Sequence, residues 1–422
     1  MWISRTDQPE RQGLHSKGAY RSVACSAKHR VIAPRGGDSK SAHTYSIDEE
    51  GEGGGESLQL AQQHDELMAE IMCYSNYDFA KVRRELDLFT PQDMSPSPPV
   101  PSAKHISPPS FNIRDISARM QGVTQPPGLR FPTGGIVGNH FILCGLYLAS
   151  SSAAFSVYAL NLDTFVWRHI EPAILATGSW NRAVIWADRA KLLVFGNQES
   201  DLAGDYGRRA VSVDHMAVVS LETFGIYTPP RLEVPQKIQE IGLSMLEESL
   251  ASDFEVVCDD GRRIKCSRKL LSDRWTWFAQ QERELKMRIA GITSDAPVDI
   301  NDTLLGACNP AKLTPTYLDL PEPFPVCVAF VQYFYTLSLS TPLQNRAPVL
   351  SALLFLAKQY KIGRLAELVV HALHERLDSS NAVGVYEIAT LSGQQNLQVR
   401  ALNVIHVSFS STHSRDKLMI VC

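Results

Sequence analysis

The sequence lacks an excess of charge of either sign. It has 41 Lys and Arg against 45 Asp and Glu, a net charge of −4 over 422 residues, and a pI near 6.3. Proteins that bind nucleic acid or an anionic bilayer usually carry a basic surplus that neutralises phosphates, so the composition gives no reason to expect either partner. With 44% hydrophobic and 20% charged residues, the chain is not disordered throughout, and its length allows two to three domains of about 150 residues each.

Metal-binding cysteine patterns and long apolar runs are also absent. Among the eight cysteines, no two have the C-x-x-C spacing, and no set of Cys and His has the spacing of a zinc site. We interpret them as reduced thiols of a cytosolic or nuclear protein, and favour a cytoplasmic location. The longest apolar stretches, 326–339 and 349–356, are shorter than the roughly 20 residues that span a bilayer. We expect no membrane span, and a transit peptide within residues 1–40 is the weaker alternative to a plain tail.

Motifs of catalytic and nucleotide-binding sites are missing as well. There is no G-x-x-x-x-G-K-[ST] loop, no G-x-S-x-G elbow and no H-E-x-x-H helix. Gly134, Gly135 and Gly138 neither have the dinucleotide-binding spacing nor begin a helix. His371 and His374 lie three residues apart on a predicted helix, but the pattern offers no further ligand, and we interpret them as surface histidines. We therefore predict no enzyme activity, no cofactor and no metal.

The N-terminal part of the chain shows few signs of a folded domain. Residues 1–57 have no sustained periodicity and include an acidic, glycine-rich run at 48–56, so we predict disorder. Residues 58–90 are rich in helix formers, with Ser57 able to cap, and we predict a helical segment. Seven of the twenty residues from 91 to 110 are proline, which holds a chain extended, and we predict a Pro-rich linker over 91–130.

Residues 131–230 contain short apolar strands separated by small and polar residues, a pattern typical of antiparallel β structure. A weak internal repeat runs through them. His-Phe-Ile-Leu-Cys-Gly at 140–145 matches Lys-Leu-Leu-Val-Phe-Gly at 191–196, 51 residues on, and Leu-Asp-Thr-Phe at 162–165 matches Leu-Glu-Thr-Phe at 221–224, 59 residues on. The difference of eight residues predicts one longer loop around 202–214. A period near 50 with four strands per unit is what kelch propeller blades show.

The unit resembles a kelch blade, and the resemblance implies structural roles for three residues. Gly145 and Gly196 end a strand and would release the chain into a tight turn, and Trp167 would pack its ring between neighbouring blades. Tyr227 stands where a second Trp is usual. Propellers close with about four to eight blades, but only two are found here. We therefore expect a partial propeller, either because upstream blades are missing or because residues 1–110 are not the true N-terminal part.

After Pro229-Pro230 the periodicity becomes helical and then strand-like. The apolar side chains between 238 and 250 fall on one face of a helix. Residues 253–258 and 262–266 are predicted to form two strands joined by an Asp-Asp-Gly turn, and 268–282 return to helical character.

This module resembles a BTB (POZ) domain over residues 238–378. The departures from the family pattern are Ser267 in place of the usual His and about thirty inserted residues, 284–315, which we predict to be a solvated loop. The matching motifs are, in chain order, Ser-Asp-Phe-Glu-Val at 252–256, the Gly261 turn, Ile-Lys-Cys-Ser-Arg-Lys-Leu-Leu-Ser at 264–272, Trp277-Phe278, Tyr-Leu-Asp-Leu-Pro at 317–321, Phe-Val-Gln-Tyr-Phe-Tyr-Thr at 330–336 and the helical hairpin of 353–365.

Residues 379–406 resemble the helical extension that often follows a BTB domain, and 407–422 are predicted to be a polar tail. The predicted fold class is multidomain. It combines a disordered N-terminal region, a partial kelch-type β-propeller of two blades over 131–230, and an α/β BTB/POZ domain with a helical extension.

The BTB resemblance implies that the module acts through contacts with other proteins. In the family, the helix before the first strand forms much of a two-fold interface, and the apolar face here is the candidate for a BTB homodimer. Packing of this face on its own domain is the alternative. Asp253 and Arg268 fall where some dimeric BTB domains hold a buried charge pair, although Asp253 could equally cap the chain. The candidate interface residues are Ile238, Ile241, Met245 and Leu246.

The order of the two modules resembles fungal Ras-activating kelch-BTB proteins. The leading hypothesis is a non-enzymatic adaptor or scaffold that assembles through BTB, recognises partners through kelch repeats, and works with small GTPase regulators in Ras-type signalling and cell morphology. One alternative is a substrate receptor of a cullin-3 ubiquitin ligase. The segment 279–284, however, lacks the apolar member of the apolar-x-Glu element that such receptors use. A BTB-type transcriptional regulator is the other alternative, but the usual zinc fingers or basic region are absent.

Overall fold

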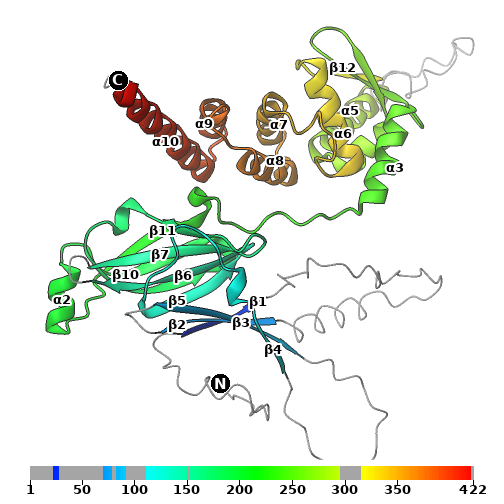
Figure 1. The fold of residues 1–422 in the computed structure, drawn as a ribbon. Helices are drawn as coiled ribbons and strands as arrows, with labels where there is room; N and C mark the ends of the chain where they lie inside the picture. The colour runs from blue at the N-terminus through cyan, green and yellow to red at the C-terminus, as the bar shows by residue number, and fades with distance from the viewer. Residues whose placement is uncertain are drawn as a thin grey trace, which may run out of the picture. The chain divides into compact units, whose positions relative to one another are not determined.

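The computed structural model describes residues 22–27, 70–77, 82–91, 111–149, 153–294 and 315–419. The chain divides into two compact units, Met1–Thr228 and Pro229–Cys422, which we call unit 1 and unit 2. Figure 1 shows that the described part of unit 1 is built mainly of strands and that of unit 2 mainly of helices.

Unit 1 contains three antiparallel sheets in its described part, each with strands in sequence order. The first sheet holds β1–β4, the second β5–β8 and the third β9–β11. The strands are β1 (Ser22–Ala27), β2 (Glu70–Tyr77), β3 (Arg83–Pro91), β4 (Phe111–Asp115), β5 (Arg130–Val137), β6 (His140–Leu148), β7 (Ala153–Asn161), β8 (Trp167–Ile170), β9 (Ser179–Trp186), β10 (Lys191–Asn197) and β11 (His215–Ser220).

Each sheet of unit 1 shares a hydrophobic core with the next one. Tyr74 on β2 and Phe141 on β6 belong to the core between the first and second sheets. The other face of the second sheet, which includes Ile142 of β6, packs on Leu192 and Val194 of β10. Because β1 contacts β5 and β5 contacts β9, the first strands of the three sheets are neighbours. The sheets thus pack face to face in chain order.

The predictions for the N-terminal part are wrong wherever the structure describes it. Strand β1 lies within the residues 1–57 predicted to be disordered, β2 and β3 lie within the predicted helical segment 58–90, and β4 lies within the predicted linker 91–130. On β2, Met72 and Tyr74 are buried by the second sheet, and Ile71 and Cys73 beside them are half-buried. This tertiary burial outweighs the helix propensity of the local sequence. The described part of unit 1 therefore has three packed sheets where two were predicted.

Unit 2 combines a small sheet with a set of helices. Its strand order is β13-β12-β14, with β13 antiparallel and β14 parallel to β12. The strands are β12 (Phe254–Val257), β13 (Arg263–Cys266) and β14 (Tyr317–Asp319), and the helices are α3 (Gln236–Glu247), α4 (Arg268–Arg274), α5 (Thr276–Ser294), α6 (Phe324–Thr336), α7 (Ala347–Gln359), α8 (Gly363–Glu375), α9 (Ala382–Leu391) and α10 (Gln395–Met419).

The core of unit 2 is centred on Trp275, which is 2% exposed. The rings of Phe278, Phe330, Phe334 and Tyr360 surround it at centroid distances of 5.0 to 5.7 Å. Trp275 also separates α4 from α5, because its backbone leaves the helical region at φ −125° and ψ 95°. Its ring therefore ties α5, α6 and the end of α7 together.

Two boundaries predicted in unit 2 need correction. The insert 284–315 was expected to be a loop, but α5 continues to Ser294, and residues 295–314 lie outside the described part. The tail 407–422 was expected to be irregular, but α10 continues to Met419. Strands and helices are present at the other positions where the periodicity predicted them, from α3 through the hairpin of β12 and β13 to α7 and α8.

Candidate interaction surfaces

The predicted interface residues on α3 divide into two groups. Ile238 and Ile241 are 52% and 53% exposed. Met245 and Leu246 are partly buried and pack against the core of unit 2. Half of the face predicted from periodicity therefore packs on the core of unit 2, and the other half is exposed. Only the two isoleucines are available to a partner.

The contact that holds α3 on the rest of unit 2 could not be found from the hydrophobic pattern, because it uses polar and small residues. Gln239 is 6% exposed, and its amide donates to the Val234 carbonyl at 2.7 Å and accepts from the Ser338 hydroxyl at 2.6 Å. A Cβ added to Gly242 would lie 2.3 Å from the carbonyl oxygen of Tyr335 on α6. A glycine inside an otherwise regular helix was the available signal.

The predicted side-chain pair of Asp253 and Arg268 is wrong. The Asp253 carboxylate accepts a hydrogen bond from the backbone N–H of Arg268 at 2.7 Å, at the start of α4. The Arg268 guanidinium instead lies 3.2 Å from Glu282 on α5 and 4.8 Å from the centroid of the Phe254 ring. Capping, the alternative considered for Asp253, is what the geometry provides. The pair with Glu282 is largely shielded from solvent, with side-chain exposures of 21% and 13%.

Trp167 lies between the first and second sheets. It is 2% exposed, and its ring is 5.6 Å from that of Tyr74 on β2 and 6.1 Å from that of Phe141 on β6. The ring therefore belongs to the core that joins the two sheets and is not available to a ligand.

Gly145 does not lead into a tight turn as predicted, whereas Gly196 is followed by one more residue of β10 before a turn at 198–199. Both lie inside strands, β6 and β10, where the pairing with the preceding strand shifts by a bulge. A Cβ would lie 2.9 Å from the Arg130 carbonyl oxygen at Gly145 and 2.2 Å from the Ser179 carbonyl oxygen at Gly196. The missing side chain lets the bulged neighbour approach closely. The equivalent positions of the two bulges support the internal repeat.

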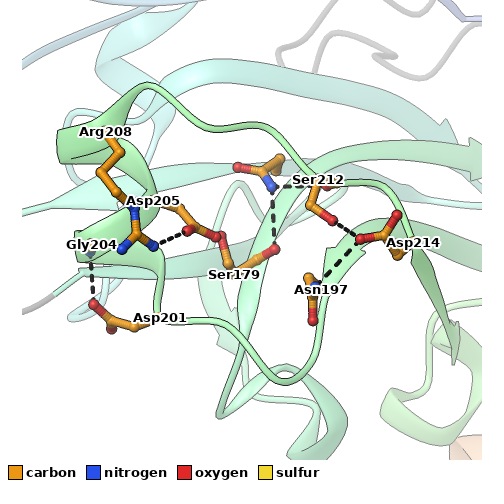
Figure 2. A network of polar contacts seen from close by, with 9 residues as sticks. Ser179, Asn197, Asp201, Gly204, Asp205, Arg208, Ser212 and Asp214 are labelled. Carbon is orange, nitrogen blue, oxygen red and sulfur yellow. Dashed lines mark hydrogen bonds and ion pairs between the residues drawn. The ribbon is translucent and has the colours of Figure 1, made fainter.

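The extra residues predicted between the repeats form α2 (Leu202–Arg208), which lies between β10 and β11. The Asp201 carboxylate accepts from the Gly204 N–H at 2.7 Å and caps the helix (Figure 2). Asp205 is 5% exposed, and Arg208 lies 2.7 Å from its carboxylate. The hydrogen bond from Arg208 lowers the pKa of Asp205 from its ordinary value.

Hydrogen bonds also fix the end of this loop to the third sheet (Figure 2). The Asn181 amide donates to the Ser179 carbonyl at 3.2 Å and to the Ser212 carbonyl at 3.3 Å. The Asp214 carboxylate accepts from the Ser212 hydroxyl and, at 3.4 Å, from the Asn197 amide. The loop is thereby held in one arrangement up to the first residue of β11.

The two histidines are not both on the surface. His374 is 1% exposed, and its Nδ1 accepts from the Arg400 guanidinium at 2.7 Å. Burial lowers the pKa of His371, whose Nε2 lies 3.5 Å from the Glu375 carboxylate. His374 thus connects α8 with α10, a contact between distant segments that spacing alone does not predict.

One buried thiol in each unit, Cys144 and Cys266, is held in its neutral form. Burial raises the pKa of Cys144 and of Cys266 to about 12, so neither is a thiolate near neutral pH. Within the described ranges, no cluster of three or more His, Cys, Asp or Glu could hold a metal ion. None of the described helices is both long and apolar enough to cross a membrane.

Comparison with known proteins gives one relative of note. No family model matches the chain. Over 348 residues the chain is 29% identical to Protein ral2 of Schizosaccharomyces pombe, an alignment that covers 79% of this chain. It covers 56% of the relative, so the chain spans little more than half of that protein's length. The chain is thus similar to Protein ral2 over most of both of its units.

Proposed function

We propose that this chain is a non-enzymatic adaptor or scaffold, in which unit 2 is a BTB-type assembly module and unit 1 a kelch-type recognition module. The exposed pair Ile238 and Ile241 carries the proposal, because two large apolar side chains stand free on a helix whose other side is packed. The β13-β12-β14 sheet with helices before and after it supports the BTB assignment. The successive sheets, with matching residues 162–165 and 221–224 following β7 and β11, support the kelch assignment.

The partner class follows from the resemblance and the relative together. The order of the modules resembles that of fungal Ras-activating kelch-BTB proteins, and this chain is similar to Protein ral2. We infer a role in Ras-type signalling and cell morphology, in which unit 1 binds a small GTPase or its regulator. The cullin-3 alternative has less support, because Glu282, the acidic residue after Phe278, is engaged by Arg268.

Replacement of the exposed isoleucines tests the assembly step. The proposal predicts that the double substitution Ile238→Lys and Ile241→Lys at least halves the mass of the full chain, 46.8 kDa per copy, in light scattering at micromolar concentration. Lysines at a two-fold apolar interface leave charges buried and facing each other. Glu240→Lys, a charge change on the same helix, is the matched control and should leave the mass unchanged. An unaltered mass in the double variant would contradict assembly through α3.

Affinity purification of the full chain from cell extract, followed by mass spectrometry, tests the partner class. The expected result is recovery of a small GTPase or its regulator without cullin-3. Recovery of cullin-3 instead would contradict the Ras-type role and support the ubiquitin ligase alternative. Salt-sensitive retention on DNA would support the transcriptional alternative.

A further inference from the structure

The third sheet is one strand short of the other two sheets of unit 1. In the described part of the chain it has three strands, whereas the first and second sheets have four. The internal repeat explains the difference. An offset of 59 residues places Pro229 and Pro230 at the positions of Ile170 and Glu171, at the end of β8. Pro229 stands at the last position of the equivalent strand and has no N–H to donate to a sheet ladder. Residues 226–229, at the positions of β8, form no strand here, and β11 remains an edge (Figure 1).

The register of β11 shows which backbone groups face this open edge. Leu221 donates its N–H to the Ala190 carbonyl at 2.8 Å, and the pairing of β11 with β10 continues from there without a shift. Hydrogen-bonded pairs alternate in an antiparallel ladder, so Ala217 and Val219 bond to β10. The N–H and C=O groups of Met216 and Val218 therefore point away from the sheet.

Edge strand β11 has little of the usual protection against pairing. The short helix Ala173–Leu175 contacts it, but the buried Leu175 packs in the core that holds Ala217 and Val219 and not on the face of Met216 and Val218. Natural edges are blunted by charged side chains, proline, bulges or a covering segment, and β11 reads His-Met-Ala-Val-Val-Ser with an unbroken register. The outer edge of the second sheet, in contrast, is covered by Gln121, which exchanges backbone hydrogen bonds with Phe165 and Trp167 at 2.7 and 2.8 Å. Met216 and Val218 are 54% and 45% exposed.

We propose that a second copy of this chain occupies the edge, with β11 pairing antiparallel to β11 of the other copy about a two-fold axis at Ala217. This pairing sets Met216 opposite Val218 of the second copy and Val218 opposite its Met216. The outward N–H and C=O groups of both residues are then satisfied reciprocally in both chains. The two third sheets become one continuous sheet of six strands.

Side chains and charges agree with this partner. Leu193 and Phe195 on β10 lie beside Val218 and Met216 on the same face, so the apolar surface continues across the axis. The same register places Asp214 opposite Ser220 of the second copy, and Ser220 pairs with Lys191 on β10. Opposite charges are then about two strand spacings, or roughly 10 Å, apart, and only a serine lies between them. The strand is complementary to itself in shape, hydrogen bonding and charge.

The test is light scattering on the full chain that carries both Ile238→Lys and Ile241→Lys. These substitutions remove assembly through α3, so the mass that remains measures pairing through β11. This double variant is expected to remain a dimer at tens of micromolar. Adding Val218→Pro removes the N–H of residue 218, which points away from β10 and would bond to the second copy. The pairing of β11 with β10 keeps its hydrogen bonds, and we expect a monomer. Val218→Thr keeps the N–H and the β preference, so it should remain dimeric. Far-UV circular dichroism establishes that each variant is folded.

Amide hydrogen exchange supplies a second measurement that does not depend on a proline being tolerated. In the same double variant, the amides of Met216 and Val218 should become more protected as the protein concentration rises through the dimer transition. Three results would each overturn the pairing: a monomer in the Ile238→Lys and Ile241→Lys double variant, a dimer that survives Val218→Pro in that variant, or amide exchange that is independent of concentration. The change in mass caused by Ile238→Lys and Ile241→Lys alone tests the assembly through α3 in the proposed function, and it does not test the pairing of β11.

Discussion

At the scale of single residues, the surfaces of this protein depend on groups that a hydrophobic pattern does not reveal. Gln239 and Gly242 decide which side of α3 is buried, although neither is apolar enough to mark a core position. Arg268 turns to Glu282, and its own N–H is left to the carboxylate of Asp253. A small residue, Gly242, thus lets α3 lie close to α6, and a backbone N–H, that of Arg268, takes the carboxylate that its side chain was expected to pair with.

Gly242→Ala tests this at one position. A Cβ there would lie 2.3 Å from the Tyr335 carbonyl oxygen, so α3 must shift on α6. We expect a loss of about 1–3 kcal/mol in the free energy of unfolding, larger than the gain of roughly 1 kcal/mol from helix propensity. Denaturant unfolding of the full chain measures it. Gly384→Ala on α9 is the control, because its Cβ meets nothing within 4 Å, and it should be neutral or stabilising. Equal effects of the two substitutions would contradict the close contact.

At the scale of elements, the sequence predicted unit 2 better than unit 1. The alternation around 253–266 and the amphipathic stretches after it lie close together in the chain, and local periodicity is enough to find them. Long segments separate β1 from β2 and β3 from β4, and the apolar residues of these strands become a core only when the second sheet covers them. Met72 and Tyr74 could be read with either period, because no local signal states what they will pack against.

The candidate surface in unit 2 was predicted from local periodicity, and the one in unit 1 was not. Ile238 and Ile241 were recognised from helical spacing and are exposed. The open edge of β11 was not recognised. It exists because the first repeat has a fourth strand, β8, and the second repeat has none. The signal was present in the chain, as Pro229 at the position of the last residue of β8 in the preceding repeat, but it gains meaning only once β8 is known to complete the second sheet.

At the scale of the whole molecule, each unit has hydrophobic cores of its own among the described residues. Trp167 belongs to the core between the first and second sheets of unit 1 and Trp275 to the core of unit 2, and no residue is shared between the cores of the two units. Domains with their own cores commonly unfold as separate cooperative units.

We therefore expect calorimetry of the full chain to resolve two transitions. Trp167→Ala should lower the midpoint of one and Trp275→Ala that of the other, each by a loss of about 3–5 kcal/mol in its own unit. The two substitutions serve as controls for each other. A single transition that both substitutions lower equally would show that the units unfold as one body.

The position of the open edge in the chain has a consequence for synthesis. Strand β11 ends at Ser220, so the edge is complete on a ribosome before unit 2, Pro229–Cys422, has been made. Translation at about 5–20 residues per second leaves it exposed for on the order of ten seconds or more. Nascent chains on one messenger are held close together during that time. Copies that pair through β11 can therefore find each other while still attached to their ribosomes, before α3 has folded in either of them.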